Sequence, residues 1–159
     1  MALTLTSSAF ADGQEIPRDH TCEGGDRSPA LTWKDVPAGT QSLALIVDDP
    51  DAPDPAAPRM IYVHWVVYNL PPTAVGLPEG VAPADLPPGA LVGVNDFGHR
   101  RYGGPCPPVG RHRYFFKLHA LDTHLPEREG ARKADVEKHM AGHVLASAQL
   151  VGTYQKTRR

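Results

Sequence analysis

Proline and glycine interrupt this chain so often that few long helices can form. The 159 residues include 17 prolines and 15 glycines, spread along the whole length. Proline lacks a backbone N–H and breaks a helix interior, and glycine favours turns. A hydrophobic fraction of 41% and a charged fraction of 21% are nonetheless typical of a globular protein. We therefore expect a single domain, residues 1–159, with many turns and short strands.

Several segments have the composition of β-strands. Residues 61–70 give the strongest pattern, because every residue from Ile61 to Tyr68 except His64 is β-branched or aromatic. Such nearly continuous hydrophobicity predicts a central strand that is covered on both faces. The other predicted strands are residues 3–7, 29–33, 41–49 and 111–122.

Two stretches depart from this strand pattern. Six prolines in the first half of residues 71–110 make regular structure improbable there, and a connection of this length is usually functional. Residues 133–150 predict one good helix, because they place four apolar side chains near one face: Val136, Met140, Val144 and Leu145. Residues 149–156 form a candidate closing strand. The sum is a mostly-β fold with one main helix in the C-terminal half.

Charge and composition exclude several classes of function. The net charge is −2 and no basic stripe is visible, so the chain is not expected to bind nucleic acid. No stretch approaches the roughly 20 apolar residues of a transmembrane segment, and the first ten residues do not form a signal peptide. We therefore expect a cytoplasmic protein in which Cys22 and Cys106 are reduced, and a disulfide scaffold is not expected.

Metal binding is not expected. A calcium loop beginning at Asp49 needs glycine at its sixth position and glutamate at its twelfth, but Asp54 and Met60 stand there. His139 and His143 have the spacing of a zinc protease, but that motif needs a glutamate directly after the first histidine. Exposed helix surface is the preferred interpretation of both histidines.

A hydrolase signature is also missing. The chain has no G-x-S-x-G motif. Cys106 lies six residues before His112, which is the kind of base that a thiol nucleophile requires. A thiol buried in the loop between prolines is the preferred interpretation.

His64 admits two interpretations. A lone histidine in an apolar strand is most often a satisfied core residue. However, His112 and Tyr114 are two residues apart on another predicted strand, so their side chains share one face. An acidic proline-rich turn and a glycine–proline turn adjoin these strands. This coincidence favours a shared functional site.

The motifs together resemble one known family. "DDPDAPDPAAP" is followed by "VHWVVYNLP", then by "NDFGHRRYGGPCPPVGRHRYFFKLHALD" and "HMAGHVLASAQLVGTYQ", and "CEGGDRSPALTW" precedes them all. This ordered set is similar to the phosphatidylethanolamine-binding protein family, in particular to its bacterial branch named for similarity to Raf kinase inhibitor proteins. Arg101 and His119 depart from that branch, which commonly has glycine and tyrosine there.

The resemblance implies a large antiparallel Greek-key sheet packed on a smaller one, with an anion pocket at one end. Asp49 would be the pocket carboxylate, and His64 would present an N–H to a ligand oxygen. The ligand-binding residues implied by the family are Asp49, Asp51, Pro53, His64, Gly104, Pro105, Pro107, Pro108, His112 and Tyr114.

Two classes of function remain open. The first is a non-catalytic binding protein for a phosphoryl or carboxylate group, such as a phospholipid head group or a phosphorylated ligand, with no cofactor. The family implies that binding modulates a kinase or protease partner, and that the protein forms a homodimer. The second is a small hydrolase or lyase that uses Asp49, His64 and His112 as acid–base groups.

Overall fold

A computed structural model gives the structure of residues 2–128 and 130–156. It contains eight strands, one α-helix and two short 3₁₀ turns at Arg18–His20 and Pro83–Asp85. The helix, α1, spans Lys133–Met140. The strands are β1 Thr4–Thr6, β2 Leu31–Lys34, β3 Ser42–Ala52, β4 Met60–Leu70, β5 Gly76–Leu77, β6 Leu91–Val92, β7 His112–Leu121 and β8 Val144–Tyr154.

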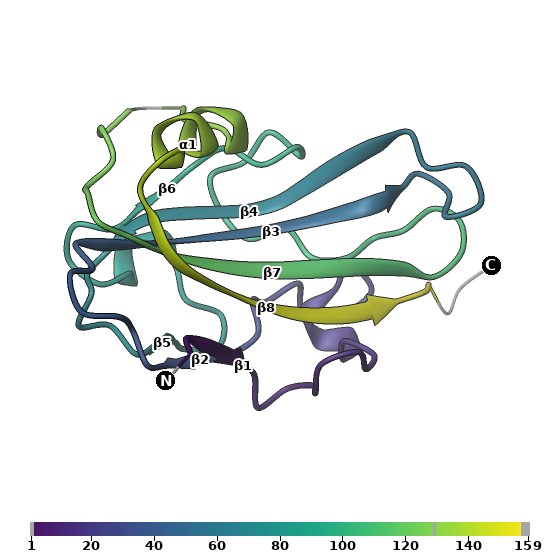
Figure 1. The fold of residues 1–159 in the computed structure, drawn as a ribbon. Coiled ribbons are helices and arrows are strands. Elements are labelled where there is room, and N and C mark those ends of the chain that lie inside the picture. The colour runs from purple at the N-terminus through teal and green to yellow at the C-terminus, as the bar shows by residue number, and fades with distance from the viewer. Residues whose placement is uncertain (1, 129, 157–159) are drawn as a thin grey trace.

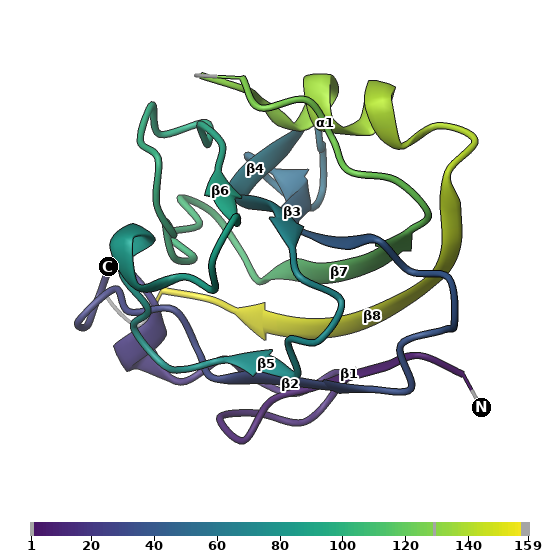
Figure 2. The ribbon, with the colours of Figure 1, turned by 90° about the vertical axis from the view of Figure 1, so that its left-hand side faces the viewer.

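The strands form two antiparallel sheets, and the helix adds a third layer (Figure 1). The small sheet has the order β1-β2-β5, and the large sheet has the order β6-β4-β3-β7-β8. The view in Figure 2 shows the small sheet below the large one and α1 above it. The predicted mostly-β fold, with a large sheet on a smaller one and one helix, is confirmed.

Each face of the large sheet carries its own core. Between the sheets, Trp33 of the small sheet packs in one cluster with Leu45, Trp65 and Phe116 of the large sheet. On the opposite face, Ala44, Ile46 and Val66 pack with Val136 and Met140 of α1. Residues 43–47 of β3 and most of β4 are therefore nearly continuously apolar, because both faces of these strands are covered.

The predicted helix over residues 133–150 is wrong in its second half. The helix ends at Met140, and Gly142 then adopts a φ of +82°, a conformation that glycine tolerates and other residues rarely adopt. The chain continues as β8, which pairs with β7 from Val144 to Tyr154. Long-range pairing with an adjacent strand outweighs the local helical pattern. Val144 and Leu145 are consequently exposed on a strand.

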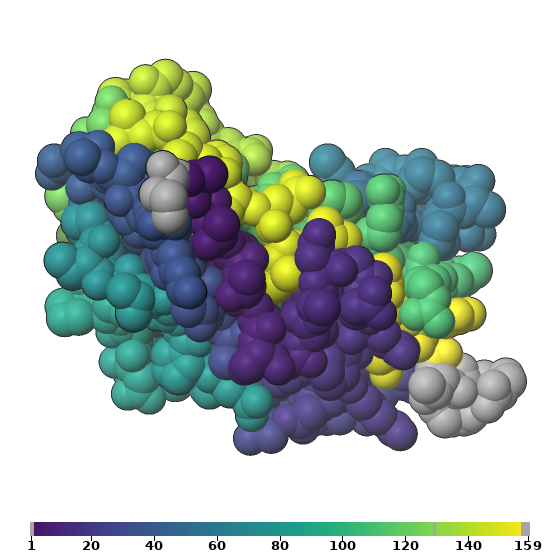
Figure 3. Space-filling model, turned by 60° about the horizontal axis from the view of Figure 1, so that its bottom comes forward, coloured from purple at the N-terminus to yellow at the C-terminus, as the bar shows by residue number. Residues whose placement is uncertain are grey.

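The N-terminal segment before β2 lies along the outer strand β8, as the space-filling view shows (Figure 3). The backbone N–H of Gly13 donates to the carbonyl of Val151 at 2.7 Å, and that of Ile16 donates to the carbonyl of Thr153 at 2.8 Å. This pairing satisfies backbone groups that an edge strand would otherwise leave open.

A buried carboxylate joins the helix to the large sheet. Asp48 is 1% exposed, and its Oδ2 atom accepts hydrogen bonds from Lys117 Nζ at 3.2 Å and Lys133 Nζ at 2.8 Å. Lys133 is the first residue of α1, and Lys117 lies on β7. Asp48 therefore points to the helix side of β3, so Asp49 points to the side of the small sheet. Among the described residues, no helix is long and apolar enough to cross a membrane.

Candidate ligand-binding site

A cavity of about 270 Å³ opens at one end of the large sheet, where β3 ends and β7 begins. Side chains from β3, β4, β7 and the long connection after β6 meet there. The lining residues are Asp49, Ala52, Pro53, Met60, Tyr62, His64, Phe97, Cys106, Pro107, Pro108, His112 and Tyr114. Within residues 2–128 and 130–156, no lysine or arginine lines the cavity, although an anion site is often lined by such residues.

His64 reaches the cavity because it sits in a β-bulge. Along the β3–β4 ladder, Val47 pairs with Trp65 and Asp48 pairs with Val63, so His64 has no partner of its own in this ladder. The extra residue lets His64 share a side with Trp65, although the two are neighbours in sequence. Trp65 can then pack in the core between the sheets while His64 lines the cavity.

The ring of His64 is fixed by the backbone of the facing loop. Its Nδ1 atom lies 2.8 Å from the carbonyl oxygen of Gly103. A carbonyl only accepts, so Nδ1 carries the proton and donates. Burial lowers the pKa of His64, and the backbone of Gly103 and Gly104 and nearby carboxylates oppose this only in part. The neutral ring therefore presents a lone pair at Nε2, not the N–H expected from the sequence.

His112 has both ring nitrogens engaged inside the protein. Nδ1 lies 2.5 Å from Oδ2 of Asp49, and Nε2 lies 2.8 Å from the carbonyl oxygen of Val109. Both His112 and Asp49 are buried. The second oxygen of Asp49 accepts a hydrogen bond from the backbone N–H of Asp51 at 2.7 Å. Both ring nitrogens of His112 and both carboxyl oxygens of Asp49 therefore already have hydrogen-bond partners within the protein.

Tyr114 differs from His112 because its polar atom has no hydrogen-bond partner among the described residues. Its side chain is 1% exposed, so this hydroxyl is buried. Burial, together with the charge of Asp49, raises the pKa of Tyr114 well above its ordinary value, so the hydroxyl keeps its proton. A buried donor without an acceptor costs free energy, and native proteins rarely leave one in this state. An acceptor atom in the cavity would satisfy it.

Aromatic rings surround His64. The ring of Tyr62 lies 5.4 Å from it, that of Phe97 5.4 Å and that of Tyr114 5.1 Å, all in edge-to-face arrangements. Buried Asn95 holds the loop that presents Phe97, because its Oδ1 accepts from the N–H groups of Phe97 and His99. The aromatic walls give the cavity a low local polarity, which strengthens any hydrogen bond made inside it.

Three of the residues implied by the family lie behind the lining. Asp51 accepts three hydrogen bonds from Arg113, one from its backbone and two from its guanidinium, all at 2.9 Å. Gly104 donates to Asp26 at 2.8 Å, and a side chain at this position would collide with the carbonyl oxygen of His20. Pro105 accepts from the N–H of Cys22 at 3.1 Å. These residues hold the strand end and the wall in place.

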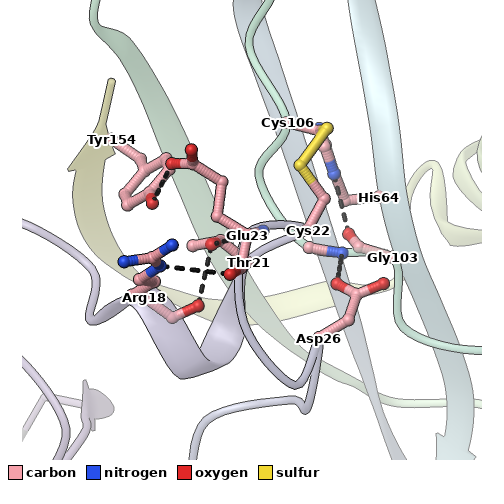
Figure 4. The surroundings of a disulfide bond; sticks show 10 residues. Arg18, Thr21, Cys22, Glu23, Asp26, His64, Gly103, Cys106 and Tyr154 are labelled. Carbon is pink, nitrogen blue, oxygen red and sulfur yellow. Dashed lines mark hydrogen bonds between the residues drawn. A yellow bond between two sulfur atoms is a disulfide. The ribbon is translucent and has the colours of Figure 1, made fainter. Parts of the chain in front are cut away.

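The two cysteines form a disulfide, so the expectation of reduced thiols is wrong. Cys22 and Cys106 are joined across 84 residues of sequence, and the Cα atoms lie 5.4 Å apart. Figure 4 shows the bond beside Gly103 and His64. Cys106 is also one of the residues that line the cavity. No spacing rule connects two cysteines so far apart, which is why the sequence did not reveal the pairing. The bond fastens the proline-rich wall to the loop that follows the first 3₁₀ turn.

Sequence reasoning overlooked five lining residues. Met60 and Tyr62 precede His64 by four and two residues, so strand alternation could have identified both. Ala52 ends β3 beside Pro53. Cys106 lies between Pro105 and Pro107 of the expected wall, which could have identified it, whereas Phe97 comes from the irregular connection and carries no local signal of its place. Within residues 2–128 and 130–156, no group of three or more histidine, cysteine or carboxylate side chains is arranged to hold a metal ion.

Comparisons with known proteins agree with this architecture. The family model described as phosphatidylethanolamine-binding protein matches residues 6–155. A UPF0098 protein of Methanothermobacter thermautotrophicus is 49% identical over 155 residues, which cover 97% of this chain and 99% of the relative. The crystal structure of a homologue of phosphatidylethanolamine-binding protein from Chlamydia trachomatis has a TM-score of 0.89 and 42% identity, with 98% of each chain covered.

A more distant structure shares the fold alone. It is a carboxypeptidase Y inhibitor in complex with its cognate proteinase, with a TM-score of 0.60 and 18% identity, over 98% of this chain and 83% of that one. The family match over nearly the whole chain and the high identity of full-length relatives lead to one conclusion. This chain belongs to the phosphatidylethanolamine-binding protein family.

Proposed function

We propose that this chain is a non-catalytic binding protein whose cavity takes the oxyanion end of a small ligand, a phosphoryl or carboxylate group. The observation that carries the proposal is the hydroxyl of Tyr114, a buried donor without a protein acceptor. An oxyanion oxygen would accept from it in a charge-assisted hydrogen bond worth roughly 1.5–3 kcal/mol. His64 Nε2 is the second polar atom left for a ligand.

The mouth of the cavity supports a ligand with an organic part. Met60, Ile61 and Val109 are each about half exposed, and Phe97 is 38% exposed. Met60 and Phe97 also line the cavity. A phospholipid head group or a phosphorylated ligand would place its anion inside and its carbon atoms against this apolar rim, because apolar surface is then removed from water.

A role in modulating a protein partner is part of the proposal. A carboxypeptidase Y inhibitor that shares this fold binds its cognate proteinase, which supports a protease as the class of partner. A kinase partner rests on the family resemblance alone. We also propose a homodimer in solution. Light scattering at micromolar concentration is the measurement for the dimer, and a monomer mass would reject it.

Calorimetric titration with phenyl phosphate tests the binding function. Wild type should bind it, and Tyr114→Phe should bind it about tenfold or more weakly, because the variant loses one hydrogen bond to a charged group. The substitution removes a single buried oxygen and keeps the ring, so thermal denaturation should show a folded protein. No binding to wild type, or equal binding to both proteins, would reject the proposal.

The enzyme alternative has one observation in its favour. His64 presents an unprotonated nitrogen in the cavity, as a general base would. The pair formed by His112 and Asp49 does not add to it, because Nε2 of His112 is bound to the Val109 carbonyl. A screen of phosphate and carboxylate esters separates the two functions. Turnover that disappears in both His64→Ala and His112→Ala would support the enzyme.

The cytoplasmic location stays a prediction. Disulfides persist mostly in oxidising compartments, with intracellular proteins of hyperthermophiles as an exception. The bond between Cys22 and Cys106 therefore weighs against a reducing cytoplasm. Thiol trapping of the native protein, followed by cell fractionation, is the direct measurement, and a periplasmic or secreted oxidised form would reject the prediction.

A further inference from the structure

We propose that the cavity selects an oxyanion that carries a proton, such as a phosphate or phosphonate monoanion, over an oxyanion of the same charge that carries none, such as a sulfonate. This inference rests on the proposed function and names the class of ligand. It follows from which atoms of the lining donate and which accept.

The first step is the tautomer of His64. Its Nδ1–H is committed to the Gly103 carbonyl at 2.8 Å, so a neutral ring can only accept at Nε2. The side chain is 3% exposed, and no protein hydrogen bond to Nε2 is found in the described part of the chain. Nε2 therefore carries a lone pair that can accept a hydrogen bond from a ligand.

The second step is the charge around that lone pair. From β3, Asp49 faces the ring, but its carboxyl group is paired with Nδ1 of His112 on β7, whose Nε2 meets the Val109 carbonyl. From β4 and β7, Tyr62 and Tyr114 face it as neutral phenols with raised pKa values. Asp48 acts only from the opposite face of β3, where two lysines hold it.

Among the described residues, no unpaired cation therefore lines the cavity, and burial lowers the pKa of His64 and so keeps the ring neutral near neutral pH. A site without a free cation cannot prefer a ligand by charge alone. It can discriminate only by the pattern of donors and acceptors, as a buried polar site does when a mismatched ligand leaves one group unpaired.

The third step is the match between that pattern and the ligand. A phosphonate monoanion has one P–OH group, which donates to His64 Nε2, and two oxygens that accept, one of them from the Tyr114 hydroxyl. A sulfonate has the same shape and the same single charge but three acceptor oxygens. One of these would face the lone pair of Nε2, which leaves His64 unsatisfied and adds repulsion.

The matched probes are phenylphosphonate and benzenesulfonate, titrated calorimetrically at about pH 6, where the singly protonated phosphonate is well populated. Phenylphosphonate should bind wild type about tenfold or more tightly. Its affinity should fall toward about pH 8 as the second proton is lost. Equal affinities in wild type would overturn the inference while leaving the binding function intact, whereas no binding of either probe would reject the binding function itself.

Two variants test which atom of the cavity causes the preference for phenylphosphonate over benzenesulfonate. His64→Phe keeps a ring between Tyr62 and Tyr114 but removes the acceptor, so the preference for phenylphosphonate should drop to about onefold. Tyr114→Phe is the matched control: it should weaken both probes by a similar factor and keep the preference. A preference that survives His64→Phe would overturn the inference.

Nitrogen NMR of His64 in wild type provides a reading that does not depend on a variant folding. We expect the Nδ1–H tautomer in the free protein, and a hydrogen bond to unprotonated Nε2 when phenylphosphonate is bound. A protonated Nε2 in the free protein near neutral pH would overturn the inference.

Discussion

The Nδ1 atom of His112 lies 2.5 Å from Oδ2 of Asp49, and the other ring nitrogen of His112 lies 2.8 Å from the carbonyl oxygen of Val109. A carbonyl only accepts, so Nε2 of His112 carries a proton, and a second proton lies between Nδ1 and Oδ2 of Asp49. With that shared proton, the pair has no net charge at the cavity wall. The pair therefore shapes the site, while Tyr114 and His64 remain to contact a ligand.

Removal of the carboxylate charge should destabilise the fold strongly. Asp49→Asn should lower the free energy of unfolding by about 3–5 kcal/mol, because the buried ring of His112 loses its carboxylate partner. Urea denaturation at neutral pH measures this change. Asp85→Asn, at an exposed position, is the control and should stay within about 0.5 kcal/mol of wild type. A loss for Asp49→Asn no larger than that of the control would contradict the assignment of the pair.

Reduction of the disulfide should weaken both the fold and the cavity wall. The bond between Cys22 and Cys106 closes a long loop, so its loss should cost about 2–4 kcal/mol of unfolding free energy. Phenyl phosphate should also bind more weakly, since Cys106 lines the cavity. Urea denaturation and calorimetry with and without a phosphine reductant measure both effects. The Cys22→Ser/Cys106→Ser double variant is the control, and it should not respond to reductant. A wild type that is equally insensitive would argue that the bond does not form.

Stability should decline as the solution becomes mildly acidic. Burial lowers the pKa values of His64 and His119 in the folded state, so the unfolded chain takes up protons first as the pH falls. The stability that the two neutral histidines contribute is fully present above the pKa of unfolded histidine, about 6.5. It is lost as the pH falls from there toward the lower pKa values of the folded state. The slope should reach up to about 1.4 kcal/mol per pH unit for each histidine. Urea denaturation between about pH 7.5 and pH 5 measures it, and an unchanged slope in His64→Phe would show that His64 is not one of these groups.

The ion pair between Asp51 and Arg113 should make stability depend on pH in a lower, more acidic range. The guanidinium of Arg113 lowers the pKa of Asp51, so its contribution is present above the unfolded value of about 3.9 and is lost as the pH falls through the folded value. Arg113→Met should cost about 1 kcal/mol at neutral pH, because the Arg113 side chain is 55% exposed. The variant should lose less further stability on acidification. Arg111→Met removes a longer, exposed contact to Glu15 and serves as the control. Equal acid profiles for Arg113→Met and wild type would contradict this account.

The sequence predicted the sheets better than the helix. The three long predicted strands 41–49, 61–70 and 111–122 correspond to β3, β4 and β7, because β-branched and aromatic runs buried on both faces give a strong local signal. The helix prediction failed after Met140, where the apolar spacing suits both a helix and a strand. Only the pairing of β8 with β7 decides between them, and that pairing is not visible in local sequence.

The candidate site also has features that local sequence predicts and features that it does not. His112 and Tyr114 share a face by strand alternation, which the sequence shows directly. The direction of the His64 ring depends on a β-bulge and on the Gly103 carbonyl, which lies 39 residues away in sequence. The disulfide across 84 residues likewise depends on the folded arrangement of the loops. Composition alone predicts none of these three features.

A crystal structure of the protein with phenylphosphonate bound is the most direct test of the central claim, that Tyr114 and His64 together hold an oxyanion. We expect one phosphonate oxygen within hydrogen-bond distance of the Tyr114 hydroxyl and another within that distance of His64 Nε2. The phenyl ring should lie toward Met60 and Phe97, and the contact of His112 with Asp49 should be unchanged. A phosphonate that instead displaces His112 from Asp49, or that leaves the Tyr114 hydroxyl without an acceptor, would contradict the account.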